Sequence, residues 1–120
     1  MALGDLELIA GTTLRFQLKW EAESELGKLE PVQMDGCTAK FAVRDVKTGE
    51  IMATADTNDG IDIDVGSSTL TVALAAHKSR HFGEASNGTV DYEVRVSFPS
   101  GDVYSLVHAG LDIKRGAIDD

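Results

Sequence analysis

Apolar and polar side chains alternate along much of this chain with a period of two residues. The longest alternating stretches are residues 13–20 and 90–98, in which every second side chain is aliphatic or aromatic. Successive side chains of a β-strand point to opposite faces, so this rhythm predicts strands with one face buried. The same rhythm recurs more briefly in residues 6–9, 39–43, 61–65 and 70–74. Residues 51–55 are expected to pair with 39–43 as a hairpin, and residues 103–113 to pair back against 90–98.

Short polar or glycine-containing segments separate these stretches and predict turns. Gly49 and the run Asn58-Asp59-Gly60 supply two of them, and residues 99–102 read Pro-Ser-Gly-Asp. Each of these residue types favours bends for a steric or hydrogen-bonding reason. About eight evenly spaced strands predict an all-β fold, an antiparallel immunoglobulin-like β-sandwich of about 7–9 short strands. Residues 1–120 form a single domain in this interpretation, because no linker or repeat divides the chain.

Two segments lack the alternation. Residues 21–36 are rich in acidic and small side chains, and we interpret them as a long loop. Residues 75–82 predict at most one short helical turn, and the polar residues 83–88 predict a flexible crossover. Long connections often carry function, so the segments 21–36 and 75–88 are the expected points of contact with neighbouring molecules.

The charge and cysteine content narrow the range of partners. Among 120 residues, 20 acidic and 11 basic side chains give a formal net charge of -9. Such a chain repels a phosphate backbone, so nucleic acid is not an expected partner. Cys37 is the single cysteine, which excludes an intrachain disulfide and suits folding in a reducing cytoplasm. The sequence has no leader of basic and then apolar residues, and no apolar run approaches the roughly 20 residues that span a bilayer. It therefore predicts no export signal and no membrane segment.

The acidic run from Asp56 to Asp64 is a candidate calcium site, because calcium binds several oxygen ligands from a short loop. Its spacing differs from the helix-loop-helix calcium signature, in which a glycine follows the first Asp by five positions and a Glu closes the loop. Here Gly60 follows Asp56 by four positions, and Ser67 stands at the closing position. We therefore interpret the run as a turn with solvated carboxylates.

The histidines and the cysteine are the other candidates for chemistry. His77 and His81 stand four residues apart and would share a helix face, but no third metal ligand accompanies them. Cys37 with His77, His81 or His108 could form a nucleophile and base, since a thiolate needs a nearby proton acceptor. Cys37 follows a glycine at the expected start of a strand, where packing is the simpler interpretation. We predict no enzymatic activity, no catalytic or metal-binding residues and no cofactor.

Aromatic side chains offer a carbohydrate-binding alternative, because flat rings can stack on sugars. Most of these rings occupy alternating positions that predict core packing. Trp20 differs, since it ends a strand beside the long loop and could lie at an edge. The set comprises Phe16, Trp20, Phe41, Phe82, Tyr92, Phe98 and Tyr104.

Four segments, taken in order, carry a family resemblance. They are residues 11–18 (GTTLRFQL), 31–45 (PVQMDGCTAKFAVRD), 91–94 (DYEV) and 101–106 (GDVYSL). Together they resemble small immunoglobulin-like virion proteins of tailed phages and prophages, and they are similar in particular to the N-terminal domain of baseplate upper proteins. The segment around Tyr92 also resembles the sandwich strand in which a tyrosine caps a corner, with Val94 where antibody domains have a cysteine.

The resemblance implies a non-enzymatic phage or prophage virion structural protein, as a baseplate, tail, adaptor or capsid-decoration component. Expected partners are other virion proteins and a second copy of the chain in a homo-oligomer, through loops and edge strands. The expected location is the virion, after synthesis and folding in the bacterial host cytoplasm. The alternative is a monomeric ligand- or carbohydrate-binding β-sandwich module that uses Trp20 or Tyr104.

Overall fold

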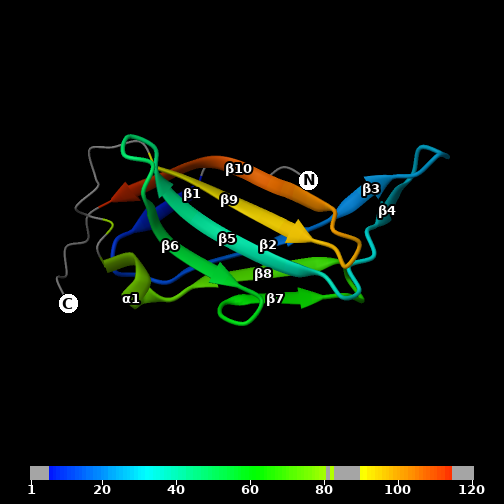
Figure 1. Ribbon diagram of the computed structural model, residues 1–120, viewed down its shortest axis with the longest axis horizontal. Coiled ribbons are helices and arrows are strands. Elements are labelled where there is room, and N and C mark those ends of the chain that lie inside the picture. The colour runs from blue at the N-terminus through cyan, green and yellow to red at the C-terminus, as the bar shows by residue number, and fades with distance from the viewer. Residues whose placement is uncertain (1–5, 81, 83–89, 115–120) are drawn as a thin grey trace.

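The alternating segments form strands that pack face to face in two layers (Figure 1). The computed structural model describes residues 6–80, 82 and 90–114. Its strands are β1 (Leu6–Ile9), β2 (Leu14–Lys19), β3 (Glu21–Glu23), β4 (Leu29–Pro31), β5 (Thr38–Asp45), β6 (Ile51–Asp56), β7 (Ile61–Asp64), β8 (Thr69–Leu74), β9 (Val90–Ser97) and β10 (Val103–Lys114). One sheet has the order β1-β10-β9-β5-β6, and the facing sheet has the order β2-β8-β7. The predicted all-β sandwich is confirmed.

Two features differ from the predicted antiparallel sandwich of about 7–9 strands. β1 runs parallel to β10, with Leu6 opposite Leu111, whereas the other strand pairs of the described residues are antiparallel. β1 turns at Gly11 into β2 of the facing sheet, which leaves β1 at the edge beside β10. The described residues contain ten strands because β3 and β4 form a separate two-stranded sheet within residues 21–36.

The strand order is that of an immunoglobulin-type sandwich. With β3 and β4 set aside, β2, β8 and β7 occupy the positions of strands B, E and D, while β10, β9 and β5 occupy those of strands G, F and C. β6 extends the larger sheet beside β5, as an extra strand does in variable-type domains. β3 and β4 therefore lie within the connection between strands B and C.

The core between the two sheets explains the two-residue rhythm of the sequence. Phe16, Phe41 and Tyr92 contact one another there, with ring centroids 5.7 to 6.0 Å apart. Val94 is fully buried two residues after Tyr92 on β9. Burying one large apolar side chain stabilises the fold by about 1.5–3 kcal/mol relative to leaving it exposed. The buried set also includes Leu14, Leu18, Ala39, Val43, Leu70, Val72, Leu74, Val90, Val96, Val107 and Leu111.

The predicted short helical turn is present as α1 (Ala76–Ser79), directly after β8. Ser79 is fully buried, and its hydroxyl accepts a hydrogen bond from the Gly11 N–H at 3.0 Å and donates one to the Thr12 carbonyl at 2.8 Å. Phe82 is buried just beyond α1. These contacts attach α1 to the turn between β1 and β2. Residues 81 and 83–88 of the predicted crossover lie outside the described residues.

Residues 21–31 form a two-stranded hairpin, called the arm below, in place of the predicted loop. The Ser24 N–H donates to the Lys28 carbonyl at 2.7 Å, and Gly27 takes a φ of 76° in the turn. No side chain of the arm is buried. The loop prediction was wrong because a hairpin with no face on the core does not need alternating apolar residues.

Candidate functional site

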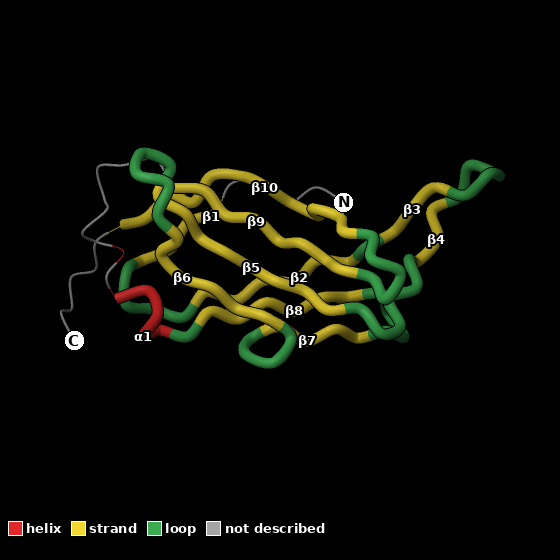
Figure 2. Tube along the Cα trace, in the orientation of Figure 1, coloured by secondary structure: helices red, strands yellow, loops and turns green. Residues whose placement is uncertain are grey.

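The arm extends beyond one end of the sandwich (Figures 1 and 2). It lies at one end of the long axis of a molecule that measures 50 × 25 × 24 Å. Leu26 is 84% exposed and Leu29 is 67% exposed, the two largest exposed fractions among the large apolar side chains described. A projecting hairpin with an apolar tip is well placed to contact another molecule.

Hydrogen bonds at the base of the arm fix it to the sandwich. The Ser68 carbonyl accepts from the Trp20 N–H at 2.8 Å, and the Ser68 hydroxyl donates to the Val32 carbonyl at 2.6 Å. The Val32 N–H donates in turn to the Trp20 carbonyl at 3.0 Å. Ser68 is buried with a φ of 54°, which is uncommon for a residue other than glycine. The base therefore holds the arm in a defined direction, which reduces the entropy lost on binding.

An aromatic cluster also lies at the base of the arm. The rings of Trp20, Phe98 and Tyr104 contact one another with centroids 5.6 to 5.7 Å apart. Tyr104 is 48% exposed, whereas Trp20 and Phe98 are partly buried against the core. Trp20 therefore lies at an edge of the sandwich, while Phe41 and Tyr92 pack inside it as predicted.

The arm is acidic as well as apolar. It carries Glu21, Glu23, Glu25 and Glu30 against a single cation, Lys28. Within residues 6–80, 82 and 90–114, none of these five side chains forms an ion pair. The arm thus offers two leucines and a net negative charge to a partner.

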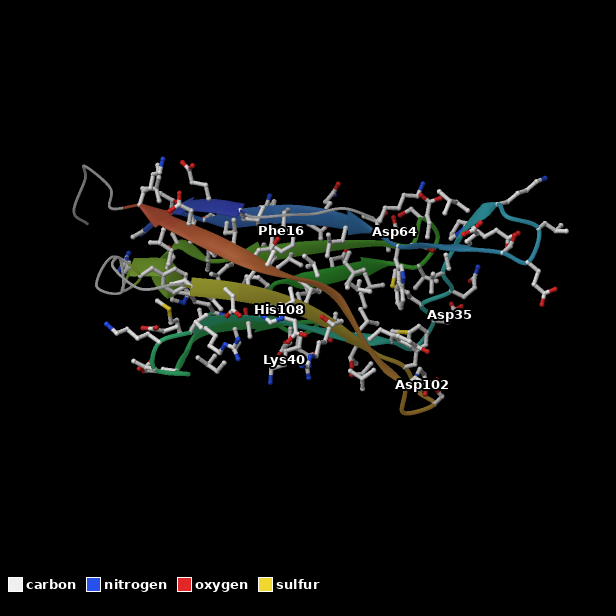
Figure 3. All side chains as sticks on the ribbon, turned by 90° about the horizontal axis from the view of Figure 1, so that it is seen from above. Phe16, Asp35, Lys40, Asp64, Asp102 and His108 are labelled. Atoms are coloured by element: carbon white, nitrogen blue, oxygen red, sulfur yellow. The ribbon has the colours of Figure 1, made fainter. Side chains whose placement is uncertain are left out.

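A shallow charged depression lies on the outer face of the five-stranded sheet. It consists of two adjoining hollows of about 170 and 240 Å³. Ala42 and the 52% exposed Ile51 add apolar surface to it. Figure 3 shows Lys40 and His108 along the middle of the molecule, whereas the arm lies beyond its end. The charged side chains that line the depression are Lys40, Arg44, Asp91, Glu93, Arg95 and His108.

Asp91 on β9 is the centre of the hydrogen bonding in this depression. Its Oδ2 lies 2.6 Å from Arg44 Nη2 and 2.5 Å from His108 Nε2, and its Oδ1 accepts from Arg44 Nε at 3.2 Å. Arg44 stands directly opposite Asp91 in the pairing of β5 with β9. Partial burial raises the pKa of Asp91, but hydrogen bonds and charge from Arg44 and His108 outweigh it and hold the pKa below its usual range.

A second carboxylate of the depression is held by an arginine of the same strand. Arg95 Nε lies 3.0 Å from Glu93 Oε2. Partial burial raises the pKa of Glu93, but hydrogen bonds from Arg95 and Ser105 outweigh this effect and hold the pKa below its usual range. Lys40 stands opposite Arg95 and forms no ion pair with any described residue. Lys40 is therefore free to meet an incoming carboxylate.

The acidic run of residues 56–64 directs its carboxylates to separate partners. Asp56 Oδ1 accepts from the Asn58 N–H at 2.8 Å, and Asp59 Oδ2 pairs with Lys78 Nζ at 2.7 Å. The hydrogen bond and charge of Lys78 hold the pKa of Asp59 below its usual range. Among the described residues, no group of three or more His, Cys, Asp and Glu side chains could hold a metal ion.

Cys37 is not brought together with His77 or His108. Cys37 directly precedes β5, whereas His108 is level with Ala42 in the strand register, roughly 16 Å further along at about 3.3 Å per residue. His77 lies in α1, at the opposite end of β5 (Figure 1). His81, the third histidine of the prediction, lies outside the described residues.

The Cys37 thiol is also poorly suited to act as a nucleophile. Burial and the nearby charge of Asp35 raise its pKa, which reduces the fraction of thiolate at neutral pH. Its N–H donates to the Met34 carbonyl at 3.1 Å in the turn before β5. Cys37 is thus a turn residue, partly buried against the core.

The charged depression was missed by sequence reasoning, although a pattern for it exists. Residues 91, 93 and 95 are all charged, and residues 40 and 44 are charged on either side of Ala42, which marks the polar faces of two strands. Neighbouring strands bring such faces together, so Arg44 and Asp91 could have been paired if the register had been known.

No helix in the described part of the chain is long and apolar enough to cross a membrane. No protein-family model matches this chain, and no curated protein matches it. The arm and the depression are therefore the features from which its function has to be inferred.

Proposed function

We propose that this chain is a non-enzymatic structural protein of a phage or prophage virion, a baseplate, tail, adaptor or capsid-decoration component that acts by protein–protein assembly. It folds in the bacterial host cytoplasm and is then incorporated into the particle. The observation that carries the proposal is the projecting arm, with Leu26 and Leu29 exposed near its tip. The resemblance to immunoglobulin-like virion proteins supplies the kind of assembly.

The energetics of the arm support a binding role. Each exposed leucine gives up about 1.5–3 kcal/mol of hydrophobic stabilisation that burial by a partner would supply. The base contacts of Ser68 hold the hairpin in place beforehand, so little ordering is needed on binding. The leucines of the tip add no hydrophobic stabilisation to the isolated fold, and contact with a partner protein accounts for their presence.

The position of the arm supports the same role. In the immunoglobulin strand order, the B–C and F–G connections lie at one end of the sandwich, and variable domains bind their targets there. The arm is the B–C connection of this chain, and residues 98–102 form the F–G turn. The fold alone does not imply binding at this end. In this chain, the exposed Leu26 and Leu29 are the features that support a contact there.

Particle composition tests the proposal directly. Mass spectrometry of particles purified from the bacterial host should detect the chain as a stoichiometric component. A Leu26→Ser, Leu29→Ser variant should fold normally and be lost from particles, because it removes the apolar tip and leaves the core intact. The matched control is Val46→Ser, which changes an exposed apolar residue in the turn at the opposite end of the sandwich and should be incorporated.

Two results would contradict virion assembly. One is the absence of the chain from particles, together with a monomeric mass by light scattering. The other is unchanged incorporation of the Leu26→Ser, Leu29→Ser variant, since the arm would then have no part in the contact.

A second candidate, a monomeric carbohydrate-binding module, is favoured by the half-exposed Tyr104. Its ring contacts Trp20 and Phe98, so a rigid aromatic surface stands at the same end as the arm. A glycan-binding screen with a Tyr104→Ala variant separates the candidates. Specific sugar binding that is lost in Tyr104→Ala and kept in the Leu26→Ser, Leu29→Ser variant would favour this module.

A further inference from the structure

The arm and the depression on the outer face of the five-stranded sheet have complementary chemistry. The arm carries four glutamates, one lysine and two exposed leucines. The depression contains the cations Lys40, Arg44 and Arg95, with its two carboxylates already hydrogen-bonded to arginine. Three cations against two carboxylates leave the depression with a formal charge of +1, and Lys40 forms no ion pair with a described residue. The depression therefore attracts an acidic segment, although the whole chain has a net charge of -9.

The apolar parts of the two surfaces also correspond. The leucines Leu26 and Leu29 are three residues apart around the turn of the hairpin. Ile51 and Ala42 offer apolar surface beside the cations of the depression. An apolar centre with charges around it is the usual arrangement of a protein interface.

The arm does not lie against the depression of its own chain. In Figure 1 it points away along the long axis, and in Figure 3 Lys40 and His108 lie on the face of the sandwich, away from that end. The contacts at Trp20, Val32 and Ser68 fix this direction. An arm that fills such a depression has to come from another molecule.

We propose that the arm of one copy binds in the depression on the outer face of the five-stranded sheet of a second copy. This inference rests on the proposed assembly function and names the partner within it. Leu26 and Leu29 cover Ile51 and Ala42, and the arm glutamates meet Lys40 and Arg95. Reciprocal exchange of arms between two copies closes a two-fold dimer, whereas repetition of the contact in one direction builds a ring or a filament.

Solution mass tests the contact first. Light scattering and sedimentation of the wild-type chain should show concentration-dependent association at about 0.1 M salt. Raising the salt to about 1 M shortens the Debye length from about 10 Å to about 3 Å, so association should weaken about tenfold or more. A wild-type chain that stays monomeric at every concentration and salt overturns the inference.

Two variants test the two surfaces separately. Leu26→Ser with Leu29→Ser disables the arm, and Lys40→Glu with Arg95→Glu disables the depression. Each should raise the dissociation constant about tenfold or more. The matched control is Arg15→Glu with Lys19→Glu, the same charge change at exposed residues of β2 on the other sheet, and it should associate as the wild type does. Circular dichroism confirms that each variant is folded.

Mixing the two disabled variants gives the sharpest result. The arm variant keeps an intact depression, and the depression variant keeps an intact arm, so an equimolar mixture should form one-to-one dimers and nothing larger. If the depression variant still self-associates, the arms contact each other and the inference is overturned. If arm substitutions abolish incorporation into particles while the pure chain is always monomeric, assembly through the arm stands and only the second copy as its partner is refuted.

Discussion

The sandwich and the arm are both built from paired strands, but they are stabilised in different ways. On β5 every second side chain is buried against the facing sheet, as Phe41 and Val43 are. The strands of the arm are three residues long and bury none of their side chains. A two-stranded hairpin of this size is marginal by itself in water. The arm therefore depends on contacts at its base, chiefly those of Ser68.

This difference separates stability from function along the chain. Substitutions in the sandwich change the free energy of unfolding, because each removes packing or forces a backbone shift. Substitutions on the arm leave that free energy nearly unchanged and act on association instead. The predictions below test this division, first in the core and then toward the surface.

Truncating the central ring of the core gives the largest expected effect. Phe41→Ala should lower the free energy of unfolding by about 3–5 kcal/mol, because Phe41 is fully buried between Phe16 and Tyr92. Leu29→Ala in the arm should change it by less than about 0.5 kcal/mol. Urea unfolding followed by circular dichroism measures both. If Phe41→Ala does not fold, Phe41→Leu should still cost more than Leu29→Ala, and the reverse order would contradict the division.

A glycine of the sandwich backbone should be nearly as sensitive. Gly60 has a φ of 105°, and a Cβ added there would lie 2.4 Å from the Ala73 carbonyl oxygen. Gly60→Ala should therefore cost about 2–3 kcal/mol from strain and displacement of the backbone. Gly49→Ala is the control, because its φ is 77° but its Cβ would meet nothing within 4 Å. Thermal unfolding should show a smaller loss for Gly49→Ala, and equal losses would mean that the close approach at Ala73 is unimportant.

The sandwich could be predicted from the sequence because burial leaves a pattern. Alternation on residues 13–20 and 90–98 corresponds to β2 and β9, and the predicted helical turn is α1. The parallel edge pairing of β1 with β10 could not be predicted, since it follows from how the chain crosses between sheets. The hairpin at residues 21–31 left no pattern because both of its faces are exposed.

The candidate surfaces were predicted only in part. Residues 21–36 were expected to form a contact region, and the exposure of Leu26 gives that expectation a physical basis. The depression depends on Arg44, Asp91 and His108, which lie on three strands and meet only through the register of the sheet. Sequence alone fixes which face of a strand is polar, but it does not fix which strands are neighbours.

Loosening the base should affect the arm more than the sandwich. Ser68→Ala removes the donor to the Val32 carbonyl and should cost about 1–2 kcal/mol. Protease cleavage within residues 24–28 should become faster. The fluorescence of Trp20, the single tryptophan, should change because Val32, which loses this hydrogen bond, also donates its N–H to the Trp20 carbonyl. Ser67→Ala alters an exposed neighbour and serves as the control. Cleavage at the same rate in both variants would show that the Ser68 hydroxyl does not anchor the arm.

The smallest expected effect is a difference in the pH dependence of stability between a carboxylate of the sandwich, Asp91, and one of the arm, Glu25. The pKa of Asp91 is lower in the folded chain than in the unfolded chain, where it is about 3.9, so the ionised carboxylate stabilises the fold above that pH. This stabilisation is lost as the pH falls through the folded pKa. Asp91→Asn should therefore be less stable than the wild type by about 1 kcal/mol at pH 7, and the difference should shrink below about pH 4. Glu25→Gln, on an arm that forms no ion pair with a described residue, should track the wild type across the same urea titrations. A constant difference for Asp91→Asn from pH 7 to pH 3 would mean that the contacts of Arg44 and His108 do not depend on the charge of Asp91.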